Sequence, residues 1–112
     1  MQKVYITHTT SFFPNEKVSN DEMEQFLGKI NDTPSKARRI VLKNNRIQNR
    51  YYALNKEGKP THQNAEMASL AIKKLFHDKE DIKKIDLISC GTSGPDFLMP
   101  SHGVMIHGHL PE

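Results

Sequence analysis

The chain has 112 residues, of which 36% are hydrophobic, 26% charged and 7% aromatic, and its formal net charge is +3. This length suits one domain, and the composition is too apolar for a wholly disordered chain. The apolar runs are too short for a transmembrane helix, and the first seven residues lack the apolar core of a secretory signal. A single cysteine excludes an internal disulfide and a cysteine-rich zinc site. We therefore expect a cytoplasmic protein without a membrane partner.

The first half of the chain predicts one strand and two helices. Alternating apolar and polar residues indicate a short strand at 4–7. Asn20 is placed to cap a helix that runs to about residue 30, and its apolar residues follow helical spacing: Met23, Phe26, Leu27 and Ile30. Thr33 followed by proline is typical of the start of a second helix, which we expect to reach about residue 44.

The second half predicts one more clear strand between helices. The segment 47–54 is expected to be irregular and extended, and 56–60 is expected to form a turn. Thr61 is placed to cap a third helix, whose close-packing stripe includes small alanines and consists of Ala65, Ala68, Ile72 and Leu75. A largely buried strand is predicted at 85–90, and a last helix is predicted from about residue 100.

This order of strands and helices indicates an α/β fold. Two strands with three helices leave sheet edges that require partners, because a small isolated sheet is marginally stable in water. We therefore expect either a truncated piece of a larger fold or a chain that needs a second chain.

A basic stretch occupies the middle of the sequence. Residues 33–56 contain no Asp or Glu and seven basic residues: Lys36, Arg38, Arg39, Lys43, Arg46, Arg50 and Lys56. Such a surface attracts phosphate-bearing ligands, nucleic acid or an acidic protein, although a solvated helix face is an equal alternative. Tyr51 and Tyr52 are its only aromatic residues, and strand neighbours face opposite sides. We expect no nucleic-acid partner.

The other chemistry-bearing residues give weaker signals. Cys90 ends an apolar predicted strand, where a lone thiol is usually a small, buried and inert side chain. The spacing of His102, His107 and His109 matches no strong metal motif, so no metal site is predicted. The loop 91–95 lacks the ending of a phosphate loop and indicates either an ordinary turn or a close backbone approach.

A set of segments, spread in order over nearly all of the chain, carries a family resemblance. These segments are 6–15 (ITHTTSFFPN) with Val18 and 20–22 (NDE), 47–50 (IQNR), 61–71 (THQNAEMASLA), 85–88 (IDLI), and 92–96 (TSGPD) with Pro100 and Ser101. Together they resemble the N-terminal part of β-ketoacyl-acyl-carrier-protein synthase III, a thiolase-like condensing enzyme.

The resemblance implies a partial thiolase-like fold, with an incomplete N-terminal half made of a mixed sheet and covering helices, in a homodimeric enzyme. In that family a cysteine takes an acyl group from coenzyme A as a thioester, and a histidine and an asparagine support decarboxylation of malonyl on acyl carrier protein. The cysteine follows the Pro-Ser helix and one further strand, so residues 1–112 are expected to be truncated before it. Cys90 does not match the nucleophile. No catalytic residue, metal or cofactor is expected in this segment, since acyl-CoA and acyl carrier protein are substrates.

The resemblance also implies candidate binding residues. Asn44 and Ile40 align with an arginine and a tryptophan that grip coenzyme A in the family, which is a departure from the usual recognition. Asn44, Arg46 and Met99 are the candidate substrate-binding residues, Met99 because it aligns with a residue that enters the partner subunit's acyl pocket. The candidates for docking a carrier protein or phosphate are Lys36, Arg39 and Lys43. Solvated charge for the basic residues and simple interface packing for Met99 remain open.

Three functions follow from these patterns. The first is an N-terminal segment of a synthase III-like acyltransferase of fatty-acid or related lipid biosynthesis, inactive by itself. The second is a noncatalytic basic module that docks an acidic protein or a phosphate-bearing ligand. The third, a basic nucleic-acid binder, is disfavoured by the lack of interleaved aromatic residues.

Overall fold

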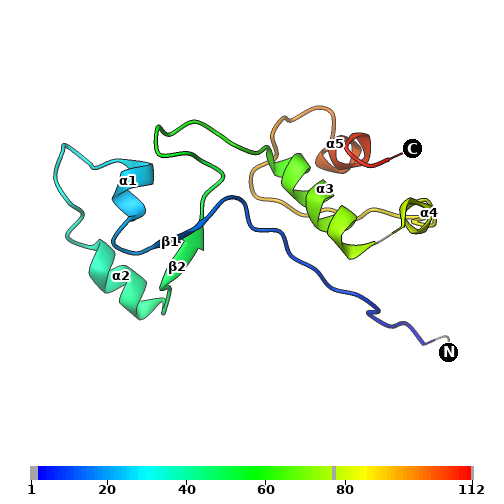
Figure 1. Ribbon diagram of the computed structural model, residues 1–112, viewed down its shortest axis with the longest axis horizontal. Coiled ribbons are helices and arrows are strands. Elements are labelled where there is room, and N and C mark those ends of the chain that lie inside the picture. Colours follow the sequence, from blue (N-terminus) through cyan, green and yellow to red (C-terminus); the bar gives the residue numbers. More distant parts are fainter. Residues whose placement is uncertain (1–2, 77, 112) are drawn as a thin grey trace. The chain divides into compact units, whose positions relative to one another are not determined.

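The computed structural model describes residues 3–76 and 78–111 and has a small mixed α/β architecture (Figure 1). The described residues form five helices and one two-stranded sheet. The elements are β1 (Lys17–Ser19), α1 (Met23–Leu27), α2 (Arg38–Asn44), β2 (Asn49–Tyr51), α3 (Asn64–Leu75), α4 (Lys79–Ile82) and α5 (His102–Gly108). The chain divides into two compact units, one made of residues 13–62 and one in which residues 63–111 join the N-terminal segment. The α/β prediction is thus confirmed in its coarse form.

The unit 13–62 is organised around the antiparallel pair of β1 and β2. Val18 lies opposite Arg50 and is only 3% exposed, so it forms the apolar centre of the pair. Tyr51 stacks on Phe13 with ring centroids 4.7 Å apart, whereas Tyr52 meets Phe26 at 5.8 Å. The two neighbouring tyrosines therefore take different aromatic partners, as alternation along an extended chain requires.

The predicted turn after β2 is confirmed. The Asn55 N–H donates to the Lys59 carbonyl at 2.9 Å, and the Asn55 side-chain oxygen accepts from the Glu57 and Lys59 N–H groups, each at 2.9 Å. Gly58 has a φ of 75°, a conformation that glycine adopts without steric cost. An isolated bridge between Leu54 and Pro60 closes this turn.

The second unit is built on the packing of α3 with α5. Its most buried residues are Ala65 and Ser69 of α3, each 1% exposed, and Ile106 of α5, 3% exposed. Small residues on α3 allow this close approach. The expected start of this helix at Thr61 is wrong, because the Glu66 carboxylate accepts from the Gln63 N–H at 3.2 Å and Gln63 becomes the cap. The Thr61 hydroxyl instead accepts from the Asn15 amide at 2.7 Å.

The two apolar strands predicted at 4–7 and 85–90 do not form in the structure. Neither segment has regular secondary structure, and several of their apolar side chains are exposed, with Val4 at 93%, Ile6 at 88% and Leu87 at 81%. A strand requires a neighbour for its N–H and C=O groups, and the described residues provide none for these segments. The prediction of strands at 4–7 and 85–90 is therefore wrong for the structure described.

Several element boundaries also differ from the predictions. The helix expected from Asn20 to about residue 30 is limited to α1, which ends at Gly28 with a φ of 76°. The second helix begins only at Arg38, whose N–H donates to the Ser35 hydroxyl at 3.2 Å. The pattern did not indicate β1 or α4, whereas the last helix, α5, begins after Ser101 as expected. Among the described helices, none is both long and apolar enough to cross a bilayer.

Candidate functional site

A basic hollow of about 820 Å³ lies beside α2 in the unit 13–62. Four of its lining side chains are cationic, and Asp21 is its one acidic lining residue. The remaining lining residues are polar or apolar. The full lining is Asn20, Asp21, Arg38, Arg39, Leu42, Lys43, Arg46, Ile47 and Gln48.

The structure brings together only part of the predicted site. Arg39, Lys43 and Arg46 share the basic hollow, whereas Lys36 and Asn44 are exposed residues outside its lining. Met99 belongs to the other unit, and its side chain is 85% exposed. The sequence placed Lys36 on one helix face with Arg39 and Lys43, but Lys36 precedes α2 and does not line the hollow.

Helix geometry explains why Arg39 and Lys43 lie together. They are four residues apart on α2 and therefore lie on one face, where two like charges destabilise a helix by about 0.2–0.5 kcal/mol. Within the described part of the chain, the side chains of Arg39, Lys43 and Arg46 make no ion pair or hydrogen bond. Their charges are thus not neutralised inside this unit.

Arg46 is placed by the turn that ends α2. The Arg46 N–H donates to the Lys43 carbonyl at 3.2 Å and the Ile47 N–H donates to the Leu42 carbonyl at 3.1 Å, which is the hydrogen-bond pattern of a Schellman motif. This motif requires a left-handed residue, and Arg46 has a φ of 55°. An arginine therefore occupies the position where glycine is usual, and its guanidinium group extends the cationic side of the hollow.

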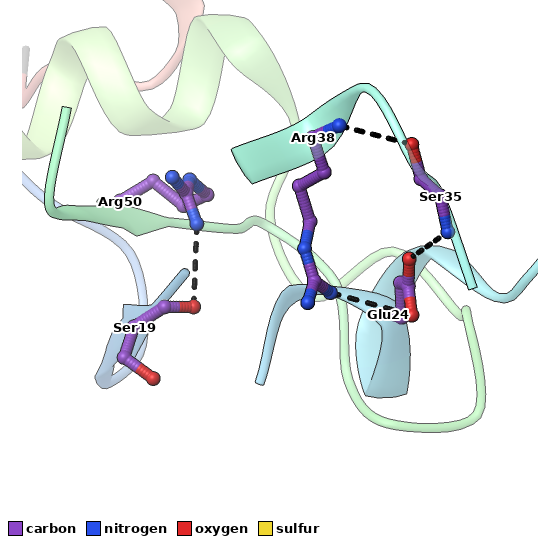
Figure 2. Close-up of polar contacts among 5 residues, drawn as sticks. All are labelled: Ser19, Glu24, Ser35, Arg38 and Arg50. Carbon is purple, nitrogen blue, oxygen red and sulfur yellow. Dashed lines mark hydrogen bonds and ion pairs between the residues drawn. The ribbon is translucent and has the colours of Figure 1, made fainter. Parts of the chain in front are cut away.

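An ion pair joins α1 to the start of α2, as Figure 2 shows. Arg38 Nη1 lies 3.3 Å from Glu24 Oε2, and the Glu24 carboxylate also accepts from the Ser35 N–H at 2.8 Å. The two charged side chains are only 22% and 15% exposed, so their attraction is screened less than that of a surface pair. Arg38 is therefore held by Glu24, and the sequence pattern gave no signal for this pair because the partners lie on different elements.

Asn20 has a different role from the predicted helix cap. Its amide donates to the Ile47 carbonyl at 2.8 Å, and its side-chain oxygen accepts from the Arg50 guanidinium. Arg50 also donates to the Ser19 carbonyl at 3.2 Å (Figure 2). Asn20 thus ties the segment before α1 to the rim of the basic hollow. The prediction that Asn20 caps a helix is wrong, since its side chain is already occupied by β2 and the residues before it.

Glu22 sits close to this network and is held by Ser19. The Ser19 hydroxyl donates to Glu22 Oε2 at 2.6 Å and the Ser19 N–H donates to the same atom at 3.1 Å. These two hydrogen bonds, the hydroxyl first, lower the pKa of Glu22, and the nearby Lys56 charge acts in the same direction. Glu22 therefore remains ionised in the segment that precedes α1.

An apolar groove of about 410 Å³ lies between α1 and α2. It shares Arg38 and Leu42 with the basic hollow, so the two depressions lie on adjoining sides of α2. Most of its lining is apolar. The lining residues are Met23, Glu24, Leu27, Gly28, Ile30, Ser35, Ala37, Arg38, Val41 and Leu42.

In the other unit, the loop 92–96 is fastened to the start of α3. Asp96 accepts from the Asn64 N–H at 2.7 Å and from the Ala65 N–H at 2.8 Å. The Asn64 amide donates to the Thr92 hydroxyl at 2.9 Å and to the Gly94 carbonyl at 2.7 Å. The loop is therefore a cap that satisfies N–H groups at the start of α3. A Cβ atom added at Gly91 or Gly94 would meet no atom within 4 Å, so the structure does not show at these glycines the close backbone approach that the sequence indicated as one alternative.

The charge of Asp96 is favoured by this arrangement. Burial raises the pKa of Asp96, but the hydrogen bonds from Ala65 and Asn64, together with His102 and His109 nearby, outweigh it and lower the pKa below its ordinary value. Asp96 is consequently a structural carboxylate.

Cys90 and His102 are two further side chains that the sequence singled out. Cys90 is exposed, which corrects the prediction of a buried thiol at the end of a strand. His102 Nδ1 is buried without a hydrogen-bond partner among the described residues. No group of three or more His, Cys, Asp or Glu side chains in the described ranges is placed to hold a metal ion. Comparison with known proteins adds no assignment, since no family model and no curated protein matches the chain.

Proposed function

We propose that these residues form the N-terminal flank of a β-ketoacyl-acyl-carrier-protein synthase III-like acyltransferase. In this proposal the whole enzyme is a homodimer that condenses an acyl thioester with malonyl on acyl carrier protein, in fatty-acid or related lipid biosynthesis. The reactive cysteine, histidine and asparagine come from sequence outside these 112 residues. The flank contributes a part of the sheet, a part of the dimer interface and a part of the ligand entrance.

One local arrangement gives the main support. Most of three segments that resemble this family lie in the same unit: residues 64–71 of the Thr-x-x-x-Ala segment are in α3, the Thr-x-x-Pro-Asp loop is 92–96, and the Pro-Ser pair precedes α5. Asp96 binds the N-terminal N–H groups of α3, and α3 packs on α5. Residues of these segments thus contact one another in the fold. Separate segments that resembled the family only by accident would not be expected to do so.

The exposed extended segments give a second, weaker line of support. Val4, Ile6 and Leu87 present apolar side chains and unpaired backbone to their surroundings. Exposed apolar strands of this kind are covered in stable proteins. Further strands of a larger sheet provide such a cover in the proposed enzyme.

The residues proposed to contact the substrate would bind it and take no part in the reaction. Arg46 offers a guanidinium to the phosphate groups of an acyl-CoA at the basic hollow, while Asn44 offers only an exposed amide beside it. Met99, on an exposed loop, supplies a flexible thioether that tolerates acyl groups of different shape. None of these residues acts as nucleophile, acid or base.

The coding sequence that follows residue 112 provides the first test. We expect it to continue into a strand and a cysteine, with a histidine and an asparagine further on. The product of the whole reading frame is then expected to condense acyl-CoA with malonyl-carrier protein, and substitution of that cysteine by alanine is expected to abolish condensation. The 112 residues alone are expected to give none.

Two results contradict this proposal. One is a reading frame that ends without the three reactive residues, and the other is measurable acyl transfer by the isolated 112 residues. The first result leaves the second candidate function, a noncatalytic docking module, as the better explanation, whereas the second result contradicts both candidates, because the 112 residues would then be catalytic by themselves. The observation that favours this second candidate is the group of uncompensated cations, Arg39, Lys43 and Arg46, around one hollow.

A further inference from the structure

Helix α2 separates a cationic surface from an apolar one. On one side is the basic hollow, and on the other is the apolar groove against α1. Arg38 and Leu42 line both, so a single ligand that crosses α2 contacts the two depressions at once. This juxtaposition is specific to the folded unit, because the groove is completed by residues of α1 and of the segment after it.

The cationic side has charge available for a partner. Arg38 is held by Glu24 at 3.3 Å, but Arg39, Lys43 and Arg46 make no ion pair within the described ranges. Asp21 supplies one opposing charge on the lining. The three cations therefore leave an excess of positive charge that favours an anionic ligand.

The apolar side is incompletely covered. Ile30 is 79% exposed, Leu27 is 51% exposed and Val41 is 50% exposed, and all three line the groove. Burying such side chains contributes about 25 cal/mol for each Å² of apolar area removed from water. A ligand that fills the groove consequently gains free energy from apolar contact as well as from charge.

We propose that α2 and its two flanking depressions bind a short acidic amphipathic helix of a partner protein. Carboxylates of the partner helix face Arg39, Lys43 and Arg46, and its apolar side chains enter the groove lined by Leu27, Ile30 and Val41. This inference rests on the docking role named above as the second candidate, and it names the chemistry of the partner. It does not depend on condensing activity.

Other anionic ligands fit the two surfaces less well. A free phosphate uses the cations but leaves the apolar groove open, and a flat anionic bilayer does not enter a concave groove. An amphipathic helix uses both, because its apolar residues repeat on one face and its acidic residues lie beside them.

The test is fluorescence anisotropy of a labelled helical peptide with Glu on one face and Leu on the other, titrated with the full 112-residue chain. We expect saturable binding that weakens as salt is raised. The double variant R39E/K43E is expected to weaken it by more than about tenfold, since like charges then face the peptide. I30S, at an exposed position that tolerates substitution, is expected to weaken it by about threefold through loss of apolar contact.

Matched controls separate specific docking from general attraction. K29E makes a similar charge reversal on an exposed lysine outside both depressions, and V4S removes a comparable exposed apolar side chain in the other unit. Both are expected to bind like the wild type. Circular dichroism of each variant verifies that its helix content is unchanged.

Three results would overturn the proposal. The first is that a peptide whose Leu residues are replaced by Ser binds as tightly as the original peptide. The second is that inorganic pyrophosphate displaces the peptide while I30S leaves peptide binding unchanged. The third is that the chain binds anionic phosphatidylserine vesicles more tightly than the peptide. The first shows that the apolar groove takes no part in binding, the second assigns the site to a small anion, and the third assigns it to a lipid surface. None of these measurements involves acyl transfer, so a failure here leaves the condensing-enzyme proposal unaffected.

Discussion

Arg46 has a left-handed backbone at the end of α2, with a φ of 55°. This conformation costs a residue with a Cβ atom about 1–2 kcal/mol, and only glycine adopts it freely. The same backbone places Arg46 on the lining of the basic hollow. Stability therefore favours glycine at position 46, whereas the positive charge of the hollow favours arginine.

Replacing Arg46 by glycine is expected to stabilise the chain by about 0.5–1 kcal/mol, because strain relief exceeds the entropy that glycine loses on folding. The measurement is the free energy of unfolding from urea denaturation. Arg46→Ala is the matched variant, since it removes the guanidinium but keeps the Cβ, and we expect no comparable stabilisation. Equal stability of the glycine and alanine variants would show that strain at Arg46 is negligible.

Single residues also show what sequence patterns miss. Arg39 and Lys43 were identified from helical spacing, which depends only on positions along one element. The ion pair of Glu24 and Arg38 was not identified from the sequence, because it joins α1 to α2 across fourteen positions of the chain. No periodicity specifies such a pair.

At the scale of elements, the loop 92–96 and α3 depend on one another. Asp96 satisfies two N–H groups at the start of α3, and Asn64 in turn holds the loop at Thr92 and Gly94. Loss of Asp96 leaves these N–H groups without their acceptor. The loop is thereby part of the folded unit and contributes to its stability.

Asp96→Ala is expected to lower the free energy of unfolding by about 1–2 kcal/mol, the usual effect of removing a capping carboxylate. Urea denaturation at neutral pH measures it. Asp86→Ala is the control, because Asp86 is an exposed aspartate in the same unit, and its effect is expected to stay within about 0.5 kcal/mol.

This contribution of Asp96 is also expected to depend on pH. The folded state lowers the pKa of Asp96, so its carboxylate adds stability above the unfolded pKa of about 3.9, and that stability is lost as pH falls through the lower folded pKa. The stability difference between the wild type and Asp96→Asn, which keeps an acceptor but cannot ionise, is expected to shrink in this acid range. A difference that stays constant from pH 6 to about pH 2 contradicts this role.

Apolar periodicity located most helices but not their limits. The stripes of α1, α2 and α3 were visible in the sequence, while their first residues were set by particular hydrogen bonds, such as that from the Gln63 N–H to Glu66. The segments 4–7 and 85–90, which were predicted to be strands, belong to no sheet in the structure. Strand formation needs a second chain segment, which one-dimensional patterns do not supply.

For the whole molecule, the exposed apolar chain has a measurable consequence. Val4, Ile6 and Leu87 are each more than four-fifths exposed in one unit. We expect the isolated chain to self-associate as its concentration rises, because unpaired extended segments find partners in other molecules. Sedimentation velocity over a range of concentrations measures this association.

The double variant I6K/L87K is expected to shift self-association to at least about tenfold higher concentration, since lysine on an exposed strand opposes pairing. Thr9→Lys adds a positive charge at an exposed polar position and serves as the control. A chain that stays monomeric at every concentration would contradict this expectation.

The sequence alone determined the α/β class in outline, the helices with a clear apolar stripe, the turn at 56–60 and the basic face of α2. Each of these depends on short-range spacing or on a residue with a special backbone preference. Only the tertiary structure decided that Arg46, rather than Lys36 or Asn44, joins Arg39 and Lys43 at one hollow, and that Asp96 caps α3. Both results bring together residues from different segments, and such contacts follow from packing in three dimensions, which local spacing does not encode.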